Sequence, residues 1–184
     1  MELPDKIFLI GYMGSGKTTV GKLLARKLAF EYVDLDERIE KLTHLSIPEI
    51  FRVHGEDYFR NQEQQALKSL ENMHQIVVAT GGGCPAYGQN MAWMKAHGMT
   101  VYLKCKPGVL FHRIAPRKEK RPLIAHLDDV DIMEFILSSL KKRLPSYSES
   151  ALTVNGEPAA KEVTEAIVSS LQQPVTSSSQ DLKK

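Results

Sequence analysis

The chain has 184 residues, of which 42% are hydrophobic and 25% are charged, and this is typical of one globular domain. The formal net charge of +2 is too small to indicate nucleic-acid binding, so any affinity for anions has to come from local clusters. No run approaches the roughly 20 apolar residues of a membrane span, and the two cysteines form no CxxC pair. We therefore expect a cytoplasmic protein that binds neither membranes nor nucleic acid.

The predicted elements alternate between strands and helices. Residues 7–10 are a fully apolar run that ends at Gly11, which is typical of a strand buried on both faces. From Lys17 onward apolar residues recur at helical spacing, so a helix follows the glycine-rich turn directly. The other predicted strands lie at 32–33, 76–79, 101–103 and 151–154, and the other helices at about 35–42, 46–55, 59–70, 88–97, 107–114, 130–144 and 159–171. This alternation predicts an α/β fold with a parallel sheet covered on both faces.

The chain shows no internal repeat, and we expect a single domain over residues 1–173. The helical pattern fails between 115 and 129, where basic residues gather, and we expect this segment to be a mobile lid. Five basic residues and one acid lie between Arg113 and Arg121, a charge suited to a loop that folds over a triphosphate. Residues 174–184 are serine-rich and polar, which predicts a disordered tail.

The glycine-rich turn carries a complete phosphate-binding motif. Residues 11–18 read GYMGSGKT and match GxxxxGK[ST] between a predicted buried strand and a helix. Its glycines let the backbone wrap around phosphate, and the helix N-terminus adds partial positive charge. Lys17 is expected to contact the β- and γ-phosphates, and the Thr18 hydroxyl to bind Mg²⁺. No NKxD-type base-reading motif of GTPases occurs. The predicted ATP-binding residues here are Gly14, Ser15, Gly16, Lys17, Thr18 and Thr19.

The metal needs a carboxylate from outside the phosphate-binding motif. The third predicted strand is followed by Thr80, at the position where many P-loop ATPases carry an aspartate that organises Mg²⁺. Asp34 and Asp36, beside the second strand, are the candidates. Two residues apart on an extended segment, their carboxylates would point the same way, one toward a metal-bound water and the other toward a substrate hydroxyl. The alternative is that both acids only stabilise the N-terminus of the following helix.

Six motifs occur in an order and spacing that resemble the shikimate kinase family. They are the P-loop, 34–36 (DLD), 55–60 (GEDYFR), 81–83 (GGG), 121–123 (RPL) and 143–147 (RLPSY). The resemblance runs from about Lys6 to Val154 and implies a three-layer P-loop kinase fold with a five-stranded parallel sheet in the order 2-3-1-4-5. It also implies that ATP, Mg²⁺ and shikimate react to give shikimate 3-phosphate and ADP. We expect a monomer.

The resemblance implies a role for each motif residue. Asp34 lies near Mg²⁺, and Asp36 binds the reacting hydroxyl of shikimate. Arg121 reaches the transferring phosphate, and Arg113 flanks the adenine. The implied catalytic residues are Lys17, Asp36 and Arg121. The implied shikimate-binding residues are Asp36, Arg60, Gly81, Gly82, Gly83 and Arg143, with the two arginines on the carboxylate and the glycines as a backbone platform.

Residue chemistry alone leaves alternatives open. Arginine suits bidentate recognition of a carboxylate, but Arg60 has Glu56 and Glu63 within helical reach and could be a surface ion-pairing residue. Arg143 follows two lysines near a predicted helix C-terminus, where cations are generally favourable. Two other functions stay open: a kinase of the same fold for another small hydroxy acid such as gluconate, and a nucleotide-binding regulator without turnover.

Overall fold

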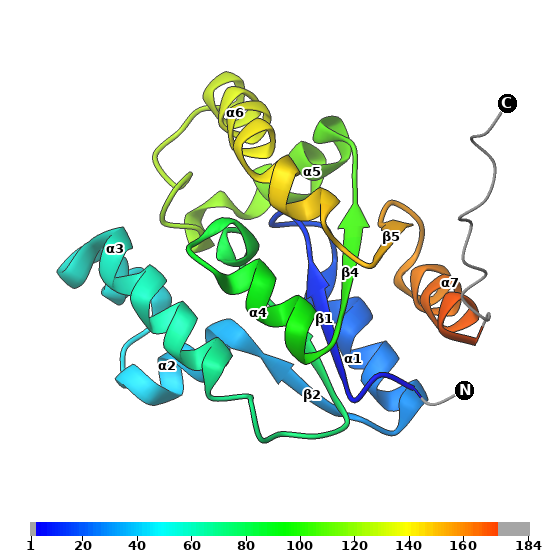
Figure 1. Cartoon of the computed structure of the whole chain (residues 1–184). Coiled ribbons are helices and arrows are strands. Elements are labelled where there is room, and N and C mark those ends of the chain that lie inside the picture. The colour runs from blue at the N-terminus through cyan, green and yellow to red at the C-terminus, as the bar shows by residue number, and fades with distance from the viewer. Residues whose placement is uncertain (1–2, 173–184) are drawn as a thin grey trace, which may run out of the picture.

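The computed structural model describes residues 3–172, so the tail predicted at 174–184 lies outside the described residues. Five parallel strands form one sheet in the order β2-β3-β1-β4-β5 (Figure 1). The α/β prediction and the strand order implied by the resemblance are therefore confirmed. The strands are β1 (Lys6–Ile10), β2 (Glu31–Asp34), β3 (Ile76–Ala79), β4 (Met99–Lys104) and β5 (Leu152–Asn155).

Helices connect the strands and cover both faces of the sheet (Figure 1). The α-helices are α1 (Lys17–Leu28), α2 (Leu35–Thr43), α3 (Ile47–Lys68), α4 (Asn90–His97), α5 (Pro107–Ile114), α6 (Asp129–Ser148) and α7 (Ala160–Gln172). Two 3₁₀ helices, η1 (Cys84–Ala86) and η2 (Ala115–Lys120), follow β3 and α5. None of the helices in residues 3–172 combines the length and the apolar character needed to cross a membrane.

The side chains of β1 divide the core into two layers. Phe8 and Ile10 pack with residues of α2, α3 and α4, whereas Ile7 and Leu9 pack with residues of α1 and α7. All four side chains are fully buried, as the apolar run predicted. A third cluster, which includes Ile124, joins α5, the lid segment and α6. The sheet is therefore closed on both faces, and its carboxyl edge is left for the loops that carry the motifs.

Two helix predictions differ from the structure. The helix predicted to end at 144 continues to Ser148 and includes Pro145. Pro145 costs one helical hydrogen bond, but the next turn is held in place because Tyr147 is fully buried against Tyr102 and donates a hydrogen bond to the carbonyl of Gly82. The lid segment, predicted to lack helix, begins with η2, and Ile124 anchors it in the third cluster.

The predicted break at Gly55 is present as a kink inside α3. Gly55 has φ 80° and ψ 178°, a conformation that glycine adopts far more readily than other residues. Ser46 caps the first half of α3 in the predicted capping box with Glu49. The kink lets the two halves of α3 take different directions, and both contribute residues to the pocket described below.

Candidate active site

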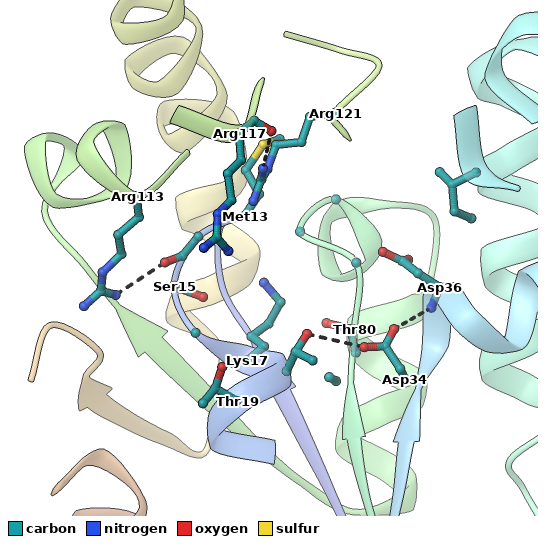
Figure 2. Close-up of a pocket in the computed structure, with 18 of the residues that line it drawn as sticks. Met13, Ser15, Lys17, Thr19, Asp34, Asp36, Thr80, Arg113, Arg117 and Arg121 are labelled. Carbon is teal, nitrogen blue, oxygen red and sulfur yellow. Dashed lines mark hydrogen bonds between the residues drawn. The ribbon is translucent and has the colours of Figure 1, made fainter. Parts of the chain in front are cut away.

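A cavity of about 1080 Å³ lies at the carboxyl edge of the sheet. Its walls come from the P-loop, β2 and α2, both halves of α3, the glycine turn after β3, the lid segment and α6. In Figure 2, Lys17 lies between the acids of β2 and α2 on one side and three arginines of α5 and the lid on the other. The structure brings together in this one pocket every site residue proposed from the sequence: Gly14, Ser15, Gly16, Lys17, Thr18, Thr19, Asp34, Asp36, Arg60, Gly81, Gly82, Gly83, Arg113, Arg121 and Arg143.

The P-loop holds its lysine in place. Gly14 and Gly16 have φ values of 81° and 96°, so the turn uses a left-handed backbone at both positions. The Nζ of Lys17 donates to the carbonyl oxygens of Gly11 at 2.8 Å and Tyr12 at 2.9 Å. Burial lowers the pKa of Lys17 to about 8, while nearby Asp36 and Asp34 oppose that shift. A charged lysine therefore lies at the centre of the pocket, with its hydrogen bonds directed to the loop itself.

Asp34 and Asp36 do not share an extended segment, so the geometry expected for them was wrong. Asp34 ends β2 and is the N-cap of α2, because its Oδ1 accepts from the backbone N–H of Asp36 at 3.1 Å. Asp36 already belongs to the first turn of α2. Both acids nevertheless line the pocket (Figure 2). The helix-terminus interpretation and the site interpretation are therefore compatible.

Asp36 has a raised pKa and, among the described residues, a buried carboxylate oxygen without a partner. Its Oδ1 is buried and has no hydrogen-bond partner within residues 3–172. Burial, together with the charge of Asp34, raises the pKa of Asp36 to about 6, although Lys17 opposes this shift. A carboxylate of this pKa can accept a proton from a bound hydroxyl.

The oxygen atoms beside Thr18 fit a magnesium ion. The Thr18 hydroxyl donates to Oδ2 of Asp34 at 3.3 Å, which leaves the oxygen lone pairs of Thr18 available to a cation. The described residues contain no cluster of three or more Asp, Glu, His or Cys residues that could hold a metal alone. Mg²⁺ commonly uses one or two protein oxygens together with substrate phosphates. Thr80, at the position where many P-loop ATPases carry a Mg²⁺-organising aspartate, donates its hydroxyl to the carbonyl of Leu9.

Arg60 forms the ion pairs that its spacing allowed, but it is not a surface residue. Its side chain is 10% exposed, with Nη1 at 2.8 Å from Oε2 of Glu63 and Nη2 at 2.9 Å from Oε1 of Glu56. Glu63 is completely buried. Burial raises the pKa of Glu63 to about 7, although Arg60 opposes the shift. From the sequence, Glu63 was considered only as a surface partner of Arg60 and was not expected beside the site. Its position three residues after Arg60 on a helix was the feature that could have indicated this contact.

The glycine turn lies directly against these charged groups. An ideal Cβ at Gly81 would lie 2.2 Å from Oε1 of Glu63, and one at Gly83 would lie 2.5 Å from Nη2 of Arg60. Any larger residue would therefore displace a buried ion pair. Residues 81–83 are glycine because side chains approach the backbone closely here.

Arg143 projects from α6 toward the same turn. Its guanidinium carbon lies 5.2 Å from the ring centroid of Tyr12, a cation–π arrangement. Its Nη1 is buried and has no hydrogen-bond partner in the part of the chain that the structure describes. An ideal Cβ at Gly82 would lie 3.5 Å from this atom. Arg143 thus presents an unused donor at the glycine turn.

Three arginines lie at the other end of the pocket (Figure 2). Arg113 donates to the carbonyls of Gly14, Gly156 and Glu157 at 3.3, 3.0 and 2.7 Å, and so connects the P-loop to the segment after β5. Arg121 donates to the carbonyl of Arg117 at 3.0 Å. Arg117 also lines the pocket, although the sequence indicated it only as part of the basic lid.

The matching family model and two curated relatives are described as shikimate kinases. The family model described as shikimate kinase matches residues 13–172. The chain is 44% identical to a shikimate kinase of Phocaeicola vulgatus over 145 residues, which cover 79% of this chain and 83% of that protein. It is 38% identical to a shikimate kinase of Aquifex aeolicus over 167 residues, which cover 91% of this chain and 96% of that protein.

Two solved shikimate kinase structures resemble the chain in both fold and sequence. A crystal structure of shikimate kinase from Bacteroides thetaiotaomicron has a TM-score of 0.87 at 36% identity, covering 92% of this chain and 99% of that one. Shikimate kinase from Acinetobacter baumannii in complex with shikimate has a TM-score of 0.83 at 34% identity, covering 91% and 92%. A gluconokinase from Sinorhizobium meliloti has a TM-score of 0.58 at 17% identity, with 93% of both chains covered, which is a likeness of fold alone.

Proposed function

The chain belongs to the shikimate kinase family, and we propose that the pocket of Figure 2 is the place where its residues bind both reactants. As a shikimate kinase it transfers the γ-phosphate of ATP to the 3-hydroxyl of shikimate, giving shikimate 3-phosphate and ADP in aromatic amino-acid biosynthesis. The family match favours this activity over the two alternatives left open by the sequence, a kinase for another small acid such as gluconate and a regulator without turnover.

One observation carries the assignment of the shikimate end of the pocket. A buried carboxylate oxygen of Asp36 and a buried guanidinium nitrogen of Arg143 both lack partners among the residues that the structure covers. Buried polar atoms are nearly always paired, so a ligand with a hydroxyl and a carboxylate would complete both. Shikimate has these groups. Arg60, fixed by Glu63, would give the carboxylate a second guanidinium, and the Gly81, Gly82 and Gly83 backbone would form the floor.

The reaction itself requires few groups. Asp36 would orient the 3-hydroxyl of shikimate and accept its proton as the bond to phosphorus forms, while the terminal oxygen of ADP leaves in line. Lys17 and Arg121 would stabilise the charge on the phosphoryl group during transfer. Thr18 and Asp34 would hold Mg²⁺, which neutralises phosphate charge when bound. Arg113, which contacts the P-loop, would flank the nucleotide base.

We also propose that the lid closes over the bound nucleotide and that the protein acts as a monomer in the cytoplasm. Residues 115–129 would close over the nucleotide and exclude water, with Ile124 as their fixed point. A monomer suffices, because one chain supplies every group named above. Cys84 and Cys105 are buried free thiols, which suits the reducing cytoplasm.

Three arginine variants test these roles. Arg60→Ala or Arg143→Ala leaves the shikimate carboxylate short of a buried partner, with an expected loss of about 2–5 kcal/mol. Because this carboxylate is bound alike in ground and transition states, the loss is expected mainly in the KM for shikimate. Arg121→Ala is expected to lower kcat with less effect on that KM.

The measurement is steady-state ADP release with shikimate, with gluconate and with no acceptor. Lys142→Ala is the matched control, because Lys142 is an exposed cation next to Arg143. Similar behaviour of all three arginine variants, or an unchanged KM for Arg60→Ala and Arg143→Ala, would refute the carboxylate assignment.

A further inference from the structure

The hydroxyl of Tyr32 contacts the carboxylate assigned above to Mg²⁺. Tyr32 lies in β2, two residues before Asp34, and donates to Oδ2 of Asp34 at 2.9 Å. The same oxygen accepts the hydroxyl of Thr18 at 3.3 Å. The tyrosine bond is the shorter of the two, and no step of the proposed reaction uses it. Tyr32 therefore has an interaction with the site that the proposed function leaves unexplained.

The ring of Tyr32 occupies a defined space on α1. An ideal Cβ at Gly21 would lie 2.7 Å from Cε2 of Tyr32, so the ring fills the volume that a side chain at Gly21 would need. The Nζ of Lys22 lies 5.5 Å from the ring centroid, on the same helix. The ring also packs against the core layer that contains Ile7 and Leu9. Because these contacts hold the ring, its hydroxyl is a donor with little freedom to move.

Three hydrogen-bond donors, from β2, α1 and α2, orient the carboxylate of Asp34. The backbone N–H of Asp36 holds Oδ1 at 3.1 Å, and the hydroxyls of Tyr32 and Thr18 hold Oδ2. Loss of the Tyr32 hydroxyl would leave Oδ2 with the longer bond alone, so the carboxylate could rotate away from Thr18. The hydroxyl of Thr18 keeps its oxygen lone pairs for a cation, and the bond that it donates to Asp34 fixes the direction in which they point.

We propose that Tyr32 is a positioning residue, which keeps Oδ2 of Asp34 directed at Thr18 and thereby strengthens binding of the metal–nucleotide complex. This inference rests on the proposed metal role of Asp34 and Thr18. Partners that orient a metal-binding carboxylate commonly affect metal affinity about 10- to 100-fold. Because Asp34 shares the ion with Thr18 and with phosphate oxygens, the lower end of this range applies.

Nucleotide binding tests the inference without reference to turnover. The dissociation constant of ADP is measured by titration calorimetry, once with excess Mg²⁺ and once with EDTA, and the ratio of the two is the metal gain. Tyr32→Phe keeps the ring and its packing and removes only the hydroxyl. We expect it to reduce the metal gain about 10-fold while affinity in EDTA changes less than about 2-fold. Tyr87→Phe, which removes an exposed hydroxyl bonded to Asn61 at 3.2 Å, is the matched control and is expected to keep the gain.

Asp34→Asn separates the inference from the function on which it rests. If the metal gain disappears in Asp34→Asn but survives in Tyr32→Phe, the positioning role of Tyr32 alone is refuted. If Asp34→Asn keeps the gain, the proposed metal site is wrong and the inference falls with it. An equal loss of ADP affinity in Mg²⁺ and in EDTA for Tyr32→Phe would also overturn the inference, because the effect would then not concern the metal.

Discussion

The buried carboxylate of Glu63 makes the stability of the protein depend on pH in a predictable direction. Glu63 is fully buried beneath the glycine turn, and Arg60 is its ion-pair partner. Burial and nearby Asp36 raise its pKa from 4.5 to about 7. The folded protein therefore holds this proton more tightly than the unfolded chain does. The perturbation is Glu63→Gln, which keeps the size of the side chain and removes the titration.

The magnitude follows from the size of the shift. A shift of one pKa unit corresponds to about 1.4 kcal/mol, so the step from 4.5 to about 7 makes ionised Glu63 cost about 3–4 kcal/mol of folding free energy. Because the folded pKa is the higher one, the stabilising contribution of the proton is complete below pH 4.5. It is lost as the pH rises through about 7. The amide that replaces the carboxyl group in Glu63→Gln cannot ionise, so the variant escapes this loss.

Urea unfolding of the ligand-free protein at pH 5, 6, 7 and 8 measures the effect. The quantity of interest is the free energy of unfolding of Glu63→Gln minus that of the wild type. We expect it to increase by about 2–3 kcal/mol in favour of the variant between pH 5 and pH 8. The attraction of Arg60 is already included in the pKa of about 7, because the ion pair forms only as Glu63 ionises. The variant also removes the repulsion between the charges of Glu63 and Asp36. Ionised Asp36 then destabilises the folded protein less, which acts in the same direction.

Glu56→Gln is the matched control, because Glu56 also pairs with Arg60 but its side chain is 50% exposed. Its curve is expected to keep a constant offset from the wild type, since an exposed carboxylate carries little desolvation cost. Parallel curves for Glu63→Gln and the wild type would refute the reasoning, because they would mean that burial does not raise the pKa of Glu63.

Three further changes test the site. Lys17→Met is expected to abolish turnover while calorimetry still finds shikimate binding, and loss of that binding in a folded variant would contradict the separation of phosphate and shikimate groups. Asp36→Asn is expected to lower kcat about 100-fold or more; an unchanged kcat would leave Asp36 as a helix-terminal charge. In the wild type kcat is expected to increase as the pH rises through about 6, because Asp36 must be ionised to accept a proton. Gly83→Ala pushes a Cβ into Arg60 and is expected to raise the KM for shikimate about 10-fold while kcat changes less; an unaltered KM would show that Arg60 moves freely.

Features encoded locally could be predicted from the sequence. The apolar run of β1, the P-loop and the capping box at Ser46 each depend on residues within a few positions of one another. The strand order could not be read from periodicity, and it came from the resemblance between motifs. The helical path through Pro145 was missed because Tyr147, whose contact with Gly82 holds that turn, depends on a partner 65 positions away.

In the site, too, features encoded locally could be predicted and those that depend on distant residues could not. Lys17 and Thr18 could be identified from one short motif, whereas the burial of Glu63 depends on α3 lying against the glycine turn. Asp34 was expected on an extended segment because a DxD spacing does not reveal whether the first acid caps a helix. Tyr32 gave no sequence signal, since an aromatic residue in a strand is ordinary. Its contact with Asp34 depends on side-chain directions that only the folded strand defines.

The central position of β1 in the sheet restricts how the chain can fold during its synthesis. Lys6 pairs with Ile76 and Ile7 pairs with Met99, so β1 is synthesised well before the two strands that flank it in the sheet. During synthesis its four consecutive apolar residues stay without a sheet, a state that favours aggregation or capture by a chaperone. The P-loop directly follows this strand. The nascent chain can therefore fold the P-loop into its final position only after β3 and β4 have been synthesised.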